Sequence, residues 1–210
     1  MAILKGGING PFSGKVGSIV GYELNGQAII RSLPNVVKRK PSGLTVINRN
    51  RMKAVSKFLK PINEVIKLGY KNLSPPGSRV GSFQTAQSYH LKTAIDYDQN
   101  TVPYVNPEKA LVFRGDLDLP IIKKIVRSGD ELQLEWESEK YQNSHYNLLV
   151  LAYDLQTYWD FYEGGAPAAK GSLSWNLSPA LVKQNQTHIY VGFHDIFSGE
   201  MSDSVYAGCV

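Results

Sequence analysis

The 210-residue chain is poor in the features that mark secreted and membrane proteins. It contains a single cysteine, Cys209, so an intrachain disulfide is excluded. No apolar run near its beginning is long enough for a signal peptide or a membrane span. We therefore expect a protein of the cytoplasm, or of a particle that is assembled in the cytoplasm.

Catalytic and metal-binding patterns are also missing. The Gly14-Lys15 pair resembles part of a phosphate-binding loop, but Asn9 stands where that motif needs glycine and Val16 where it needs Ser or Thr. The four histidines have no third ligand at a recognised metal spacing, and no nucleophile motif occurs. The sequence thus predicts no enzymatic activity, no cofactor, no metal and no small-molecule substrate.

Acidic residues are scarce in the first part of the chain. Residues 1–81 hold fourteen Lys and Arg but only two acids, which gives a net charge of +12. Residues 82–210 hold nine bases and sixteen acids, a net charge of −7. A basic half can bind nucleic acid, an anionic surface or the acidic half of another copy, and the remaining alternative is an uneven, solvated surface.

Glycines interrupt a strand-like pattern over residues 1–34. The Asn25-Gly26 pair stands between two apolar alternations, which is the strongest short signal for a β-hairpin. A hairpin is barely stable alone, and its open edges can accept a further strand, so we predict that it pairs between copies of the chain. The predicted assembly residues are Val16, Ile19, Val20, Tyr22, Leu24, Ala28 and Ile30.

Residues 45–72 have the apolar periodicity of a helix, which Pro61 should kink or split and Gly69 should cap. A second, basic stripe follows the same helix and is the predicted surface for an anionic partner. Base stacking is not indicated, because the one aromatic residue near the stripe, Phe58, lies beside the apolar side. Including the preceding linker, the surface comprises Lys38, Arg39, Lys40, Arg49, Lys53, Lys57, Lys60 and Lys67.

Ser82 is the predicted N-cap of a second helix, and from residue 108 onward short strand-like segments alternate with turn residues. We therefore predict an α+β, mostly β fold, in which an N-terminal β-hairpin and two helices precede an immunoglobulin- or fibronectin-like antiparallel β-sandwich. The predicted domains are residues 1–103 and 104–210. The predicted strands are residues 109–114, 120–126, 131–138, 147–155, 157–162, 171–177, 188–195 and 204–210.

Five segments resemble one bacterial family of unknown function, the domain-of-unknown-function family 6266. They are "MAILKGGINGPFSGKVGSIVGY", "IRSLPNVVKRKPSGLT", "SYHLKTAI", "ALVFRGDLDLP" and the ending "SDSVYAGCV". The resemblance covers nearly the whole chain and implies a glycine-rich start and a β-rich C-terminal half. It implies no catalytic residues.

Two functions are compatible with these patterns. The leading hypothesis is a non-enzymatic structural subunit of a homo-oligomeric assembly, such as a filament, a tube or a phage-derived particle. The alternative is a nucleic-acid-associated protein that uses the basic helix stripe.

Overall fold

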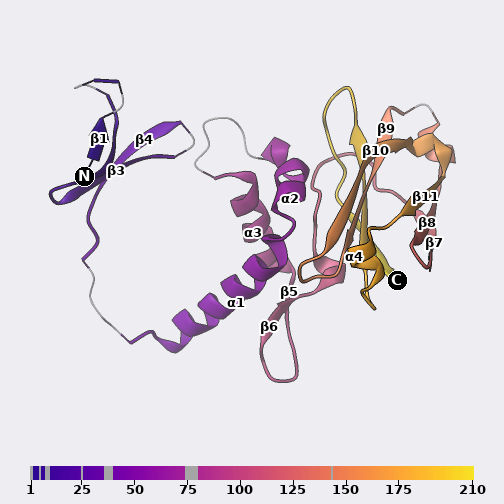
Figure 1. Cartoon of the computed structure of the whole chain (residues 1–210), viewed down its shortest axis with the longest axis horizontal. Helices are drawn as coiled ribbons and strands as arrows, with labels where there is room; N and C mark the ends of the chain where they lie inside the picture. The colour runs from indigo at the N-terminus through magenta and orange to yellow at the C-terminus, as the bar shows by residue number, and fades with distance from the viewer. Residues whose placement is uncertain are drawn as a thin grey trace.

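A computed structural model describes residues 2–4, 6–7, 10–24, 26–35, 40–73, 80–142 and 144–210. The chain has an α+β, mostly β fold with antiparallel sheets, as the sequence predicts. Figure 1 shows three parts along the long axis: a small N-terminal sheet at one end, helices in the middle and a β-sandwich at the other end. The two chain ends lie at opposite ends of this axis.

The N-terminal sheet contains the predicted hairpin and two further strands. Leu24 and Gln27 face each other across a two-residue turn, and Gly26 has a φ of 78° there, a conformation that glycine adopts without strain. Asn25, the other turn residue, lies outside the described residues. The strands follow their order in the chain and are β1 (Ala2–Leu4), β2 (Phe12–Val16), β3 (Ile19–Leu24) and β4 (Gln27–Ser32).

The predicted long helix is two helices, α1 (Gly43–Leu59) and α2 (Asn63–Gly69). The break falls around Pro61, which lacks the backbone N–H that a continuous helix needs. The third helix, α3 (Ser82–Thr93), begins one residue earlier than predicted. Its N-cap is Gly81, whose carbonyl accepts the backbone N–H of Thr85 at 3.0 Å, so that Ser82 is already helical.

Gly69 is the last residue of α2 and not the residue that follows it, so its predicted role as a C-cap is wrong. The C-cap is Tyr70. A side chain at position 69 would collide with the carbonyl of Val112, and the Gly69 carbonyl itself accepts the N–H of Arg114 at 3.0 Å. Glycine is therefore needed because two backbone segments approach closely, not because a turn must form.

Residues 109–114 were predicted as a strand, and this prediction is wrong. The segment is buried at Val112 and Phe113 but joins no sheet. The N–H of Val112 donates to the Ser204 hydroxyl at 2.9 Å, and the Phe113 carbonyl accepts the N–H of Ser204 at 3.0 Å. Because a side chain and the end of a helix satisfy its backbone groups, the segment is buried without a strand ladder.

The remaining predicted strands form a two-sheet sandwich. One sheet has the order β11-β8-β7 and the other the order β10-β9-β12-β13. In immunoglobulin constant domains the first, second, fourth and fifth strands form one sheet and the other three strands form the second. Here the fourth strand of the sandwich, β10, belongs instead to the sheet of the third, sixth and seventh strands. The bounds are β7 (Ile122–Ser128), β8 (Glu131–Trp136), β9 (Tyr146–Tyr153), β10 (Trp159–Pro167), β11 (Ser172–Asn176), β12 (His188–Asp195) and β13 (Val205–Cys209).

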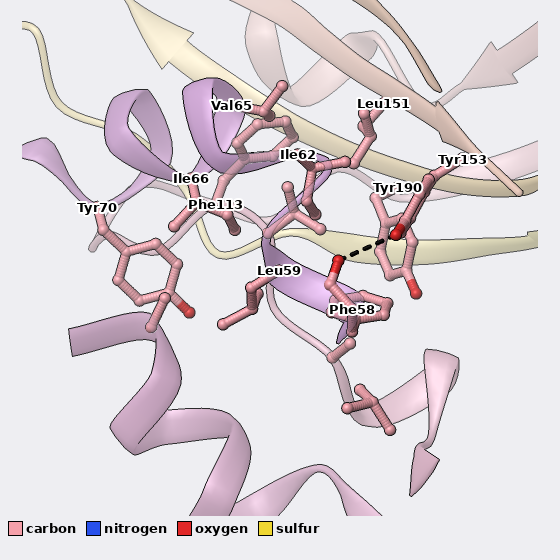
Figure 2. Packing of buried hydrophobic residues seen from close by; sticks show 14 of the residues in the cluster. Phe58, Leu59, Ile62, Val65, Ile66, Tyr70, Phe113, Leu151, Tyr153 and Tyr190 are labelled. Carbon is pink, nitrogen blue, oxygen red and sulfur yellow. Dashed lines mark hydrogen bonds between the residues drawn. The ribbon is translucent and has the colours of Figure 1, made fainter. Parts of the chain in front are cut away.

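Strand β9 is buried on both faces and joins two hydrophobic cores. Leu148 and Val150 point into the sandwich, while Leu149 and Leu151 point to the core that the helices cover. Figure 2 shows this second core, where the Tyr153 hydroxyl donates to the Phe58 carbonyl of α1 at 3.0 Å. The helices thus form a third layer on the sandwich.

A short hairpin lies beside α1, formed by β5 (Ile95–Tyr97) and β6 (Pro103–Val105). It crosses the position where the sequence divides the chain into residues 1–103 and 104–210, a division that stays a prediction. The other elements are a short helix, α4 (Pro179–Val182), and four 3-10 turns, η1 (Lys71–Leu73), η2 (Pro107–Lys109), η3 (Glu139–Tyr141) and η4 (Ala168–Lys170).

Candidate binding surfaces

The N-terminal sheet contributes no side chain to either hydrophobic core. Among the described residues of 2–35, Gly21 alone is buried, and it is covered from within the sheet by the ring and carbonyl of Phe12. The residues that form the two cores begin at Val55. A sheet with one layer and no core of its own has little to stabilise it apart from its backbone hydrogen bonds.

One side of this sheet, which we call the apolar face, is largely hydrophobic and open to solvent. The register aligns Gly14, Gly21 and Ile30 in one row and places Val16 opposite Ile19. Since alternate residues of a strand share a side, Leu4 and Ile30 lie on the same face, and they are 57% and 64% exposed. The apolar members of this face are Ala2, Leu4, Phe12, Val16, Ile19, Ala28 and Ile30, and its polar members are Glu23 and Ser32.

The predicted assembly residues divide between the two faces of the sheet. Val16, Ile19, Ala28 and Ile30 belong to the apolar face. The opposite face carries the others together with charged groups, and the guanidinium of Arg31 lies 5.7 Å from the ring centre of Tyr22. The members of this opposite face are Ile3, Ser13, Lys15, Val20, Tyr22, Leu24, Gln27, Ile29 and Arg31.

The predicted basic surface is exposed wherever the structure describes it. Lys38 and Arg39 lie outside the described residues. Lys40 precedes α1, and Lys67 belongs to α2, beyond the break at Pro61. The other four border one hollow of about 420 Å³ on the surface of α1, and they are Arg49, Lys53, Lys57 and Lys60.

A larger groove, which we call the α1–β6 groove, lies on another side of Lys53 and Lys57. It has a volume of about 720 Å³, within the range of ligand pockets. Its walls come from α1, from the β5–β6 hairpin and from the turn after β9. The lining residues are Asn50, Lys53, Ala54, Lys57, Phe58, Asn100, Thr101, Val102, Pro103, Tyr104, Val105 and Leu155.

Two strained turns border this groove. Thr101 has a φ of 59° and Leu155 a φ of 62°, and they are the non-glycine residues with positive φ in the described part of the chain. A β-branched residue such as Thr rarely adopts this conformation. Backbone strain of this kind costs about 1–3 kcal/mol per residue and gathers at functional sites.

Aspartate side chains hold both turns. Asp98 Oδ1 accepts the backbone N–H groups of Asn100 at 2.9 Å and Val102 at 2.8 Å. Asp154 Oδ1 accepts three backbone N–H groups of the turn that contains Leu155, at 2.7 to 3.0 Å. The carboxylates near the groove are thereby bound to their own turns.

The charge of the groove lining is positive. It contains two lysines and no carboxylate, and neither Lys53 nor Lys57 has a salt bridge with a described residue. Asp96, which faces Tyr104 across the hairpin, is neutralised by Lys109 at 2.8 Å. The hydrogen bonds from Lys109 and Asn106 hold the pKa of the Asp96 carboxyl below its usual value.

Sequence reasoning found the lysines of this groove but missed its opposite wall. Val102 and Tyr104 are 55% and 44% exposed and come from a segment about fifty residues away, and Leu155 comes from about a hundred residues away. The proline and the polar residues of the segment indicate only a loop. The apolar character of Val102, Pro103 and Tyr104 within that loop was the one available signal.

The described residues form neither a metal site nor a membrane-spanning helix. No cluster of three or more His, Cys, Asp or Glu there is arranged to hold a metal ion. No helix within those same ranges has the length and apolar character needed to cross a membrane.

Comparison with known proteins agrees with the resemblance seen in the sequence. No curated protein and no solved structure matches the chain. One family model matches residues 11–208, which is nearly the whole chain, and it describes a family of unknown function. The prediction made from five sequence segments is therefore confirmed, and the chain belongs to the family of unknown function DUF6266.

Proposed function

We propose that this protein is a non-enzymatic structural subunit that assembles with copies of itself through the N-terminal sheet. The observation that carries the proposal is the uncovered apolar face, which includes Leu4, Val16, Ile19 and Ile30. Exposed apolar patches of this kind mark interaction sites, because their burial removes hydrophobic surface from water. A filament, a tube or a phage-derived particle, assembled in the cytoplasm, would suit such a subunit.

A second copy is the occupant that suits this face best. Two apolar faces that pack on each other make a sandwich, which is the arrangement that stabilises the C-terminal half of the same chain. Within this face the ring of Phe12 covers Gly21 and fills the space that a side chain there would occupy, so the ring belongs to the surface that a second sheet would contact. The outer edges of β1 and β4 are also open to strand pairing, the contact that the sequence predicts.

The uneven distribution of charge along the chain favours one relative orientation of neighbouring copies. In the further contacts that extend such a pair into a larger assembly, the basic residues 1–81 of one copy attract the acidic residues 82–210 of another. Exposed ion pairs contribute only about 0–1 kcal/mol each, so apolar contact and strand pairing must supply most of the affinity. Charge then mainly sets the association rate and the orientation.

The test compares two double variants of the full chain by size-exclusion chromatography with light scattering. Ile19→Asp with Ile30→Asp places two charges on the apolar face, and the unmodified protein should be oligomeric while this variant is a monomer. The matched control is Ile3→Asp with Leu24→Asp, on the opposite face of the same sheet. The control should remain oligomeric.

The proposal fails if the unmodified protein is a monomer at every concentration tested. It fails equally if both double variants dissociate to the same extent, because the apolar face would then have no special role. Circular dichroism of each variant checks that the rest of the chain is folded.

A further inference from the structure

The α1–β6 groove combines features that the proposed assembly does not use. It is lined by Lys53 and Lys57 of α1 on one wall and by Val102, Pro103 and Tyr104 on the other. Since no carboxylate lines it, the groove favours an anion. The exposed apolar and aromatic wall favours an anion that also carries a flat or apolar group.

The spacing of the lysines suits phosphate groups. Lys53 and Lys57 are four residues apart on α1, so their side chains project from neighbouring turns on one side of the helix. Asn50 lies one turn before Lys53 on the same side and adds an amide that can donate a hydrogen bond. Both lysines also border the hollow that Arg49 and Lys60 line, so positive charge continues out of the groove along α1.

Because the positive charge continues along α1, an extended polyanion can contact more of it than a compact anion can. A phosphate chain can pass from the groove across Lys53 and Lys57 into the second hollow. Tyr104 offers the ring on which a base can stack, and this supplies the aromatic group that the sequence of α1 lacks. A duplex hides the faces of its bases, whereas a single strand exposes them.

Two hydrogen-bonded turns form part of the rim of the groove. Thr101 and Leu155 are held in strained conformations by the Asp98 and Asp154 turns, and both line this one groove. Strain that the surrounding hydrogen bonds maintain indicates a surface held ready for a ligand. Such pre-organisation lowers the entropic cost of binding.

We propose that the α1–β6 groove binds a nucleotide unit of single-stranded nucleic acid, with phosphates at Lys53 and Lys57 and a base against Tyr104. The site does not depend on the N-terminal sheet, so it stands or falls separately from the assembly proposal. Of the predicted basic surface, this proposal keeps only Lys53 and Lys57, which line the groove opposite Tyr104.

The first experiment measures the fluorescence anisotropy of a labelled oligothymidylate titrated with the full-length protein at several salt concentrations. The double variant Lys53→Glu with Lys57→Glu should lose binding at moderate salt. Where low salt still allows a measurement, the log–log salt slope should be flatter by about 1.4, because each lost contact with a single strand removes about 0.7. The charge-matched control, Lys67→Glu with Lys71→Glu, should retain most of the binding, since neither residue lines the groove.

The second experiment tests the aromatic wall. Tyr104→Ala should weaken binding roughly 5- to 150-fold, as expected for the loss of one stacked base, and Tyr104→Phe should restore it. The control Tyr97→Ala removes an exposed tyrosine from the same hairpin but outside the groove lining, and binding should not change. Melting curves of all variants check that the exposed substitutions leave the fold intact.

Competition distinguishes the sources of the nucleotide. If thymidine monophosphate displaces the oligothymidylate only weakly, a strand is supported as the ligand. If it displaces the oligothymidylate with the affinity of the strand, a free nucleotide is supported as the ligand of the same site. The proposal is overturned if the unmodified protein does not bind the oligothymidylate at low salt. It is also overturned if a duplex binds more tightly, or if the two lysine double variants lose the same affinity.

Discussion

The N-terminal sheet and the sandwich are both antiparallel, but they differ in what covers them. In the sandwich, β9 has Leu148 and Val150 on one side and Leu149 and Leu151 on the other, and all four are fully buried. In the N-terminal sheet, Ile30 is 64% exposed on the apolar face. Similar strand residues thus have opposite environments, because a second layer covers one sheet and no described part of the chain covers the other.

The comparison shows that a strand-forming sequence does not by itself produce a core. The sheet β10-β9-β12-β13 is covered on one side by β11-β8-β7 and on the other by α1, α2 and α3. Figure 1 shows the N-terminal sheet apart from these layers, at the opposite end of the long axis from the sandwich. We expect its missing layer to come from another copy.

The largest expected effect is the difference between truncating a buried and an exposed apolar residue. Leu151→Ala removes a fully buried side chain from the core under the helices and should lower the free energy of unfolding by about 2–5 kcal/mol. Ile30→Ala should change it by less than about 0.5 kcal/mol in the unassembled protein. Urea denaturation of both variants measures the difference.

An equal loss of unfolding free energy in the two variants would mean that the N-terminal sheet is part of the folded core. The two sheets would then not differ in what covers them. The denaturation is carried out at a protein concentration low enough for the unmodified chain to be a monomer. Under that condition a contribution from assembly does not enter the measurement.

The second expected effect is a dependence of stability on pH. It arises in the helices that cover the sandwich, and the N-terminal sheet has no equivalent. His90 of α3 is fully buried, and its Nδ1 donates to the Ala86 carbonyl at 2.8 Å while Nε2 has no partner among the described residues. Desolvation by burial lowers the pKa of His90 from 6.5 to about 4, although the bond to Ala86 opposes this shift. The neutral ring is therefore the form that suits the fold.

The sign of the pH dependence follows from the lowered pKa. Between about pH 6.5 and pH 4 the unfolded chain binds a proton at His90 that the folded chain does not, so stability falls as the pH falls. The full loss is about 3 kcal/mol, at 1.36 kcal/mol for each unit of pKa. Urea denaturation from pH 7 to pH 4 should show this loss, and His90→Gln should reduce it.

His145→Gln provides the control, because His145 is exposed and outside both cores. This variant should keep the pH dependence of the unmodified protein. A His90→Gln variant with an unchanged pH dependence would show that other groups cause the loss of stability.

The smallest expected change in the free energy of unfolding is the one caused by deleting the whole N-terminal sheet. Deletion of residues 1–34 removes no residue of either core, so the free energy of unfolding of the remainder should change by less than about 0.5 kcal/mol. The same deletion should convert the oligomer to a monomer in light scattering. A truncated protein that does not fold would show that the sheet is intramolecular core, and one that still assembles would show that another surface joins the copies.

The sequence predicted the sandwich because its signals are local. The alternation of Leu132, Leu134 and Trp136 marks β8 as a strand with one buried side, and all three residues are buried. The apolar run of β9 is typical of a strand that is buried on both sides, as β9 is. Turn residues between the segments then separated seven strands correctly.

The predictions that failed concern contacts between distant segments. Residues 109–114 have the composition of a strand, but the hydroxyl of Ser204 and the carbonyl of Gly69 take their hydrogen bonds. The β5–β6 hairpin is not among the predicted strands, because two strands of three residues give too short a periodicity to recognise. Neither the partners of residues 109–114 nor the packing of β6 against α1 can be read from local pattern.

The sequence by itself determined the strands of the sandwich, the glycine-rich hairpin, the break of the helix at Pro61 and the basic stripe of α1. These follow from periodicity, turn chemistry and charge, which act over a few residues. Only the tertiary structure decided that β9 lies between two cores, that the N-terminal sheet leaves one apolar face open, and that Tyr104 faces Lys53 and Lys57 across a groove. Those facts depend on which segments pack together, because burial is a property of the surroundings of a side chain and not of its position in the chain.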